Sequence, residues 1–238
     1  LPPAPDSHSV AITAACDITA EAEAVAAAMV KLTLDATCLP NERLTVHHNG
    51  MIFTEVTDDK GRLNVTVPAL AEEAVFILAF GNGDGAVAQT SVSELSGFNR
   101  IVLQWKGAAG FELHAREFDY GDAGHVWSGA PRDMTAAVLG EGGFMTRNGD
   151  TDTSDPLMAE VYSFPVAAAA QEGDVALSVE AEVSEANCGL EIEAQALELR
   201  GSDQVKTQNL TLAVPDCDAV GNFLVLNNLL QDLKVAQN

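Results

Sequence analysis

Apolar and polar residues alternate with a period of two along most of this chain. Alternation covers residues 30–34, 44–46, 63–67, 101–105, 175–183 and 210–214. Successive side chains of a strand point to opposite faces, so the pattern predicts strands with one buried face and one wet face. Gly-, Asn- and Asp-containing turn sequences at 49–50, 59–61 and 200–203 lie between these strands. Short strands at this spacing predict antiparallel β-sandwiches.

Some segments depart from simple alternation. Residues 75–80 are apolar throughout, which predicts a strand buried on both faces. The following Gly-Asn-Gly-Asp-Gly at 81–85 resembles a phosphate-binding loop, but such a loop must open a helix. Residues 86–92 read as another strand, so we interpret 81–85 as a hairpin loop. The helix candidates are 20–28, which has high helix propensity, 134–139 and 231–236, the last being either a short helix or a final strand.

These patterns predict an all-β protein of two antiparallel β-sandwiches joined by an irregular, Gly-rich segment. The expected divisions are an N-terminal extension at 1–15, a first sandwich at 16–106, the connector at 107–165 and a second sandwich at 166–238, which could include part of the connector. Similar strands follow one another in the same order in both halves. The sequence leaves open whether the two sandwiches arose by duplication.

Composition and charge narrow the classes of function. The chain has 238 residues, of which 47% are hydrophobic, so a sizeable core is available. Lys and Arg number 12 against 35 Asp and Glu, and the formal net charge is −23. Nucleic-acid binding requires clusters of Lys and Arg, and anionic lipid also attracts basic segments. Both partners are therefore disfavoured, and no apolar stretch is long enough to span a membrane.

The four cysteines are Cys16, Cys38, Cys188 and Cys217. Four cysteines allow three pairings, and the simplest joins Cys16 to Cys38 and Cys188 to Cys217, one bridge in each half. Four buried thiols are the alternative. A zinc site is disfavoured because the sequence has no Cys-x-x-Cys spacing and no His beside a Cys. Bridges of this kind favour an oxidising compartment.

The chain begins Leu1-Pro2-Pro3-Ala4-Pro5 without an initiator Met, which favours removal of a leader peptide and export. The next ten residues, 6–15, place Val10, Ile12 and Ala14 in alternation with small and polar residues. We expect this segment to pair with a sheet edge, for example that of an adjacent subunit.

The most site-like segment is 114–127. It contains His114, Asp119, Tyr120, Asp122, His125 and Trp127. Such groups bind a metal ion if they converge, and aromatic rings with nearby carboxylates can hold a sugar. No motif spacing enforces convergence, so a folded connector with packed aromatic rings is the favoured interpretation.

Asp150, Asp152 and Asp155 resemble the start of a calcium loop, since calcium takes six or more oxygen ligands. The EF-hand pattern fails, because Asp155 stands where glycine is needed and Val161 where the pattern requires glutamate. Calcium is therefore a possible ligand of another oxygen cage, and a solvated acidic turn is the alternative. The sequence contains no nucleophile-elbow, zinc-protease or Walker motif.

Residues 54–68, Thr-Glu-Val-Thr-Asp-Asp-Lys-Gly-Arg-Leu-Asn-Val-Thr-Val-Pro, resemble the T-D-x-x-G-x-[FL]-x-V signature of carboxypeptidase-regulatory-like and CnaB-like sandwiches. That resemblance implies a noncatalytic immunoglobulin-like or prealbumin-like domain of a secreted or surface protein. The chain as a whole is similar to an uncharacterised group of exported Gram-negative bacterial proteins, some labelled "translocase". The sequence offers no nucleotide site and no membrane span to support that label.

We therefore expect a non-enzymatic subunit of an extracellular, cell-surface or periplasmic assembly, fibre-like or adhesin-like, that self-associates through strand edges and needs no cofactor. Sandwiches expose edges that a neighbouring strand can complete. The first alternative is a secreted module that binds carbohydrate or calcium through the 114–127 and 150–155 segments. The second is a hydrolase with an unrecognised site, for which a deep pocket lined by His114 and His125 would be diagnostic.

Overall fold

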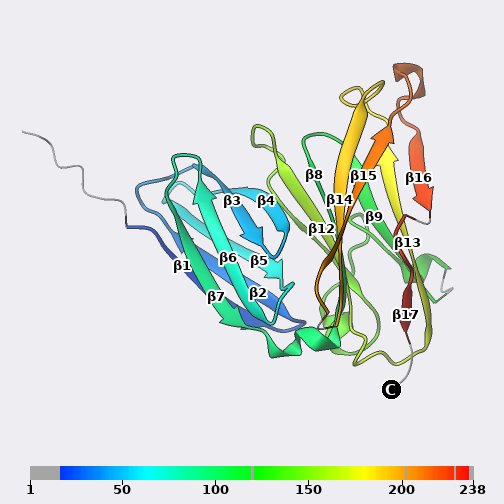
Figure 1. The fold of residues 1–238 in the computed structure, drawn as a ribbon, viewed down its shortest axis with the longest axis horizontal. Helices are drawn as coiled ribbons and strands as arrows, with labels where there is room; N and C mark the ends of the chain where they lie inside the picture. The colour runs from blue at the N-terminus through cyan, green and yellow to red at the C-terminus, as the bar shows by residue number, and fades with distance from the viewer. Residues whose placement is uncertain (1–16, 119–120, 202, 228, 236–238) are drawn as a thin grey trace, which may run out of the picture.

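The computed structural model describes residues 17–118, 121–201, 203–227 and 229–235, and nearly all of its regular structure is antiparallel strand. Figure 1 shows two layered units side by side, the N-terminal one in blue and cyan and the C-terminal one in green to red. The prediction of an all-β sandwich architecture is confirmed. No helix in the described ranges is long and apolar enough to cross a membrane.

The first sandwich contains two sheets. Sheet A has the order β1 (Thr19–Val25), β2 (Met29–Asp35), β5 (Arg62–Pro68), and sheet B has the order β4 (Met51–Val56), β3 (Arg43–His48), β6 (Glu73–Phe80), β7 (Gly85–Ser91). The loop at 81–85 joins β6 to β7 in an antiparallel hairpin, as predicted.

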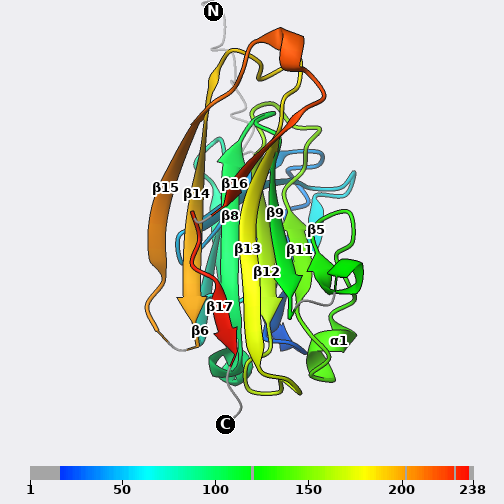
Figure 2. The same ribbon diagram turned by 90° about the vertical axis from the view of Figure 1, so that its right-hand side faces the viewer.

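The second sandwich also contains two sheets (Figure 2). Sheet C has the order β11 (Phe144–Asn148), β12 (Leu157–Phe164), β8 (Asn99–Lys106), β14 (Glu191–Arg200), β15 (Lys206–Ala213). Sheet D has the order β10 (His125–Val126), β9 (Phe111–Glu117), β13 (Gly173–Glu182), β16 (Phe223–Asn227), and β17 (Leu233–Val235) also pairs with β13. Short helices lie between strands: η1 (Ser93–Gly97), η2 (Gly121–Gly124), α1 (Thr135–Val138) and η3 (Cys217–Ala219).

The expected division of the chain differs from the observed one at β8 and beyond. β8 was assigned to the first sandwich, but it pairs with β12 and β14 in the second. The segment 107–165 is not a structureless connector, because it supplies β9, β10, β11 and β12. Sequence alternation identifies a strand but not its partner, so it could not place these strands in a sheet.

Two strands have burial patterns opposite to those expected. β6 was predicted to be buried on both faces, yet Val75 and Ile77 are 43% and 48% exposed. β8 was predicted to alternate between buried and exposed side chains, yet all but its last residue are buried. The cause is that sheet C is a middle layer: one face packs on sheet D and the other on the first sandwich (Figure 1).

Three segments with ambiguous helical signals are resolved. Residues 20–28 contribute to edge strand β1, which pairs along its full length with β2, so tertiary pairing overrides helix propensity. Residues 231–236 contain strand β17, and residues 134–139 contain the single turn α1.

The proposed internal repeat is not reproduced by the strand pairing. The four strands compared in the first half are β2, β3, β5 and β6, and β2 pairs with β5 while β3 pairs with β6. The corresponding strands of the second half are β13, β14, β15 and β16, and there β13 pairs with β16 while β14 pairs with β15. The two halves share strand order along the chain but not topology.

A buried arginine joins the two sandwiches. Arg100 lies on β8 and is fully buried, and its guanidinium donates to the carbonyl oxygens of Ala69 at 2.5 Å and Ala27 at 2.7 Å. Desolvation lowers the pKa of Arg100 to about 9, so the group remains charged at neutral pH. The contact fixes the second sandwich against two loops of the first.

The predicted bridge between Cys188 and Cys217 is present, with Cα atoms 4.9 Å apart. Cys38 is also disulfide-bonded, whereas Cys16 lies outside the described residues. The 188–217 bridge connects the loop between β13 and β14 to η3, which lies between β15 and β16.

We expect the double substitution Cys188→Ser/Cys217→Ser to lower the free energy of unfolding by roughly 3 kcal/mol, because a bridge closing a loop of this size restricts the unfolded chain. Denaturant titration of the wild-type and variant proteins measures the difference. A variant as stable as the wild type would show that the bridge adds nothing to the folded state.

Candidate functional site

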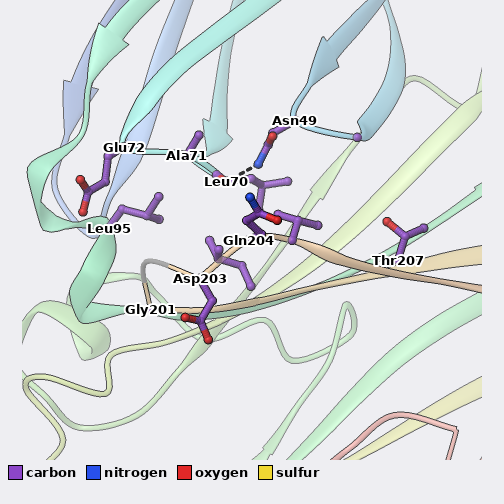
Figure 3. Close-up of a pocket in the computed structure, with 12 residues that line it drawn as sticks. Asn49, Leu70, Ala71, Glu72, Leu95, Gly201, Asp203, Gln204 and Thr207 are labelled. Atoms are coloured by element: carbon purple, nitrogen blue, oxygen red, sulfur yellow. Dashed lines mark hydrogen bonds between the residues drawn. The ribbon is translucent and has the colours of Figure 1, made fainter.

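A groove separates the two sandwiches along the outer face of sheet C. Figure 3 shows one end of it, a hollow of about 630 Å³ between the β3–β4 turn at Asn49, the loop at Leu70–Glu72 and the β14–β15 connection near Gln204. Two neighbouring hollows of about 490 Å³ each continue the groove. One of them shares Gly50 with the first hollow, and the two share Gln104 and Gln195 with each other. The three hollows form one groove that follows β15 from Thr207 to Thr211.

The floor of the groove carries a ladder of side-chain amides. Gln104, Gln195 and Asn209 are opposite one another on β8, β14 and β15. Gln104 Nε2 donates to Gln195 Oε1 at 2.8 Å, and Gln195 Nε2 donates to Asn209 Oδ1 at 2.9 Å. Such an amide ladder orders the floor in advance of any contact made to it.

The same ladder connects the floor to the first sandwich. Gln104 Oε1 accepts from the backbone N–H of Ile52 at 2.9 Å, and its Nε2 also donates to the carbonyl of Gly50 at 3.0 Å. Because both residues belong to the β3–β4 hairpin, these bonds set the position of the opposite wall of the groove.

That opposite wall is the outer face of sheet B, and it is largely apolar. Val75 and Ile77 of β6 line the groove beside His47. Val87 of β7 is opposite Ile77 on the same face and is 61% exposed. Sequence reasoning missed this wall, because a fully apolar strand such as β6 gives no indication of which face remains uncovered.

Strand β15 forms the edge of sheet C beside the groove and pairs only with β14 among the described strands. Its two faces differ. Thr207, Asn209 and Thr211 are exposed and line the groove. Leu210, which also borders the groove, is buried in the core of the second sandwich, and Leu212 packs partly against that core. An edge strand with one polar and one apolar face can accept a further strand of the same pattern.

Strand β16 is the matching edge of sheet D, and it is apolar on both faces. Leu224 and Leu226 pack partly against the core, while Phe223 and Val225 on the other face are 51% and 50% exposed. Figure 2 shows β15 and β16 on the same side of the second sandwich. The core between them is therefore only partly covered by the described chain.

The outer face of sheet D brings together part of the predicted ligand segment. His114 Nδ1 and His125 Nε2 are 2.7 Å apart, and the ring of Trp127 stacks on His114 at 5.2 Å between centroids. His114 Nε2 lies 3.4 Å from Glu112 Oε2 and 3.6 Å from Glu180 Oε2. One imidazole must donate to the other, so this contact requires at least one neutral ring.

Burial lowers the pKa of both His114 and His125, and the nearby Glu180 carboxylate opposes part of this shift. Burial also raises the pKa of Glu112, and the charge of Glu180 adds to that increase. The half-buried ring of Trp127 stacks on both imidazoles.

Asp122 is exposed and, with His125, lines a hollow of about 870 Å³ that does not include His114 among its lining residues. Asp119 and Tyr120 lie outside the described residues.

The acidic segment 150–155 is a contact between the sandwiches. Asp150 N–H donates to the Thr54 carbonyl at 2.7 Å, and the Asp155 carbonyl accepts from Arg43 at 3.2 Å. Asp152 N–H donates to Asp150 Oδ1, and Asp155 Oδ2 lies 3.7 Å from Lys106 Nζ. Within the described ranges, no group of three or more His, Cys, Asp or Glu side chains is placed to hold a metal ion.

No protein-family model matches the chain, and no curated protein matches its sequence. The class is therefore defined by the fold: an acidic, disulfide-containing, all-β protein of two packed sandwiches with open strand edges and a groove beside one of them. The N-terminal residues Val10, Ile12 and Ala14, which are predicted to pair with a sheet edge, lie outside the described residues.

Proposed function

We propose that this protein is a non-enzymatic structural subunit of an exported assembly at the cell surface or in the periplasm, and that copies associate by adding strands to open sheet edges. The observation that supports the proposal is the paired opening at β15 and β16. Leu212 of β15 and Leu224 and Leu226 of β16 are half-buried, and neither strand has a second neighbour among the described residues. An added strand would bury this apolar surface and satisfy the edge backbone groups.

Deleting residues 1–15 is expected to convert the assembled protein into a monomer while leaving each sandwich folded. The reason is that both described core clusters are built from residues within 17–235, all of which the deletion retains. Size-exclusion chromatography with light scattering, over a range of protein concentrations, measures the mass. Deleting only residues 1–5 is the control, because it retains the alternating segment.

Two results would contradict the proposal. A full-length chain that is monomeric at all concentrations would show that it does not self-associate. An oligomer of unchanged mass after deletion of residues 1–15 would show that the N-terminal segment has no part in the assembly.

A further inference from the structure

We infer that β15 is the acceptor edge, and that residues 8–14 of a second copy add to it as a sixth strand of sheet C beside the groove. The inference rests on the proposed function and specifies the partner and the contact surface. It follows from a match between two patterns: the alternation of the N-terminal segment and the two faces of β15.

The N-terminal segment has two distinct faces when extended. Val10, Ile12 and Ala14 fall on one, and Ser9, Ala11 and Thr13 on the other. The first face is apolar and the second consists of small side chains, two of which carry hydroxyl groups. Period-two alternation of this kind requires one buried face and one polar environment.

β15 offers the same two environments. On its inner side, Leu212 packs partly against the core of the second sandwich, as Leu224 and Leu226 of β16 do, and Val10 and Ile12 would be buried there. On its outer side, Thr207, Asn209 and Thr211 form the edge of the groove. Hydroxyl and amide side chains on neighbouring strands form favourable cross-strand pairs, so Ser9 and Thr13 suit this side.

β16 is the less suitable edge for this donor. Its outward face carries Phe223 and Val225, so a strand added there would need apolar residues on both faces. The small hydroxyl-bearing face of the N-terminal segment does not meet that requirement. The polarity of the two faces therefore selects β15.

Charge is consistent with the same donor. The protein has a formal net charge of −23, so most pairs of surfaces from two copies repel each other. Residues 8–14 contain no Asp or Glu, and β15 contains no Asp or Glu and begins with Lys206. The contact therefore places two segments without acidic side chains against each other.

A second copy, rather than the same one, is the expected donor. The described chain begins at Asp17, and β1 lies in the first sandwich on the side away from the second sandwich (Figure 1). β15 is on the far side of the groove from it. A donor that enters the next copy in this way produces a head-to-tail arrangement, which extends into a chain of subunits unless it closes into a ring.

The test uses full-length variants that disable one side of the contact each. Ile12→Asp disables the donor and Leu212→Glu disables the acceptor, and each alone is expected to be monomeric. Mixing the two variants is expected to restore one contact, between the intact donor of the Leu212→Glu chain and the intact acceptor of the Ile12→Asp chain. The mixture should therefore give a 1:1 dimer of twice the monomer mass that grows no further.

Three controls make the result specific. Ala4→Asp adds the same charge outside the segment and should assemble as the wild type does. Val225→Glu introduces a glutamate on β16, as Leu212→Glu does on β15, and this variant should also assemble. An excess of a synthetic peptide of residues 1–15 should reduce the wild-type assembly to monomers, whereas a scrambled peptide should not, and this result does not depend on the stability of any variant.

Different outcomes overturn different statements. If the wild type assembles but Val225→Glu, rather than Leu212→Glu, abolishes assembly, β15 is not the acceptor and only this inference fails. If assembly persists in Ile12→Asp and withstands the peptide, residues 8–14 are not the donor. If the wild type is monomeric throughout, the proposed function fails and this inference fails with it.

Discussion

Replacing Glu117 with alanine is expected to reduce the free energy of unfolding by about 3–5 kcal/mol, the cost of leaving a buried charge without its partner. Glu117 lies on β9 and its side chain is 1% exposed. Its Oε2 accepts from Arg132 Nη1 at 2.6 Å, and its Oε1 accepts from Tyr162 Oη at 2.5 Å and from the Gly143 N–H at 2.8 Å. Alanine would remove the acceptor for all three donors at once.

The Glu117 carboxylate also holds in place the long segment that connects β9 to β11. Arg132 donates to the carbonyl oxygens of Gly143 and Ala123 as well as to Glu117, so one ion pair fixes the segment that carries His125. Burial and the adjacent carboxylate raise the pKa of Tyr162 well above its usual value, which keeps the phenol protonated and able to donate.

Denaturant unfolding of Glu117→Ala, Tyr162→Phe and the exposed-site control Glu72→Ala tests this account. Tyr162→Phe removes a single hydrogen bond to a charged group and should cost about 1.5–3 kcal/mol, and Glu72→Ala should change stability by less than about 0.5 kcal/mol. If Glu117→Ala lowers the free energy of unfolding by less than about 1 kcal/mol, the ion pair and its hydrogen bonds are not needed to hold the segment between β9 and β11 in place.

Acidification is expected to destabilise the first sandwich through His48. Its ring is buried and stacked on Phe76 at 4.1 Å. Nδ1 donates to the carbonyl of Val75 at 2.9 Å, and Nε2 accepts from the N–H of Leu70 at 2.7 Å. Both nitrogens are satisfied only in the neutral ring, because a proton on Nε2 would face another donor.

Desolvation, with a smaller contribution from the charge of Arg100, lowers the pKa of His48 to about 4 from 6.5. The folded state therefore binds the proton less readily than the unfolded chain does. The resulting stability is complete above pH 6.5, declines as the pH falls and is lost by about pH 4. A pKa difference of this size between the folded and unfolded states corresponds to about 3 kcal/mol in the free energy of unfolding.

The measurement compares the wild type with His48→Gln and Val46→Ala from pH 7 to pH 4. Carboxylates titrate over the same range in all three proteins, so the difference between wild type and His48→Gln isolates the histidine. That difference should shrink by about 3 kcal/mol on acidification, whereas the deficit of the core control Val46→Ala should stay constant. A constant difference for His48→Gln would show that His48 does not carry the pH dependence.

The contrast between β6 and β8 shows the limit of pattern reading. Both were identified as strands from their apolar residues, and both assignments are confirmed. The sequence predicted β6 to be buried on both faces and β8 on one, and the structure shows the reverse, because burial depends on which layers cover a sheet. Sheet D covers one face of β8 and the first sandwich covers the other. The outer face of β6 is left open, so Val75 and Ile77 form a groove wall that the sequence did not indicate.

The two candidate ligand segments also differ in how well the sequence predicted their arrangement in space. His114 and His125 belong to one short segment of the sequence, and antiparallel pairing of β9 with β10 brings their rings together. Asp150 and Asp155 are close in the sequence, but their loop packs against the first sandwich and its backbone and side chains make other contacts. Proximity along the chain therefore indicated convergence for the two histidines but not for the two aspartates.

The sequence by itself determined the strand-rich class, most strand positions, the hairpin loop at 81–85 and the bridge between Cys188 and Cys217, because each follows from local alternation, turn chemistry or short separation. Only the tertiary structure decided the partner of β8, the strands within 107–165, the buried positions of Arg100 and Glu117, and the groove beside β15. These depend on contacts between residues far apart in the chain, and such contacts are set by how sheets stack rather than by the period of any one strand.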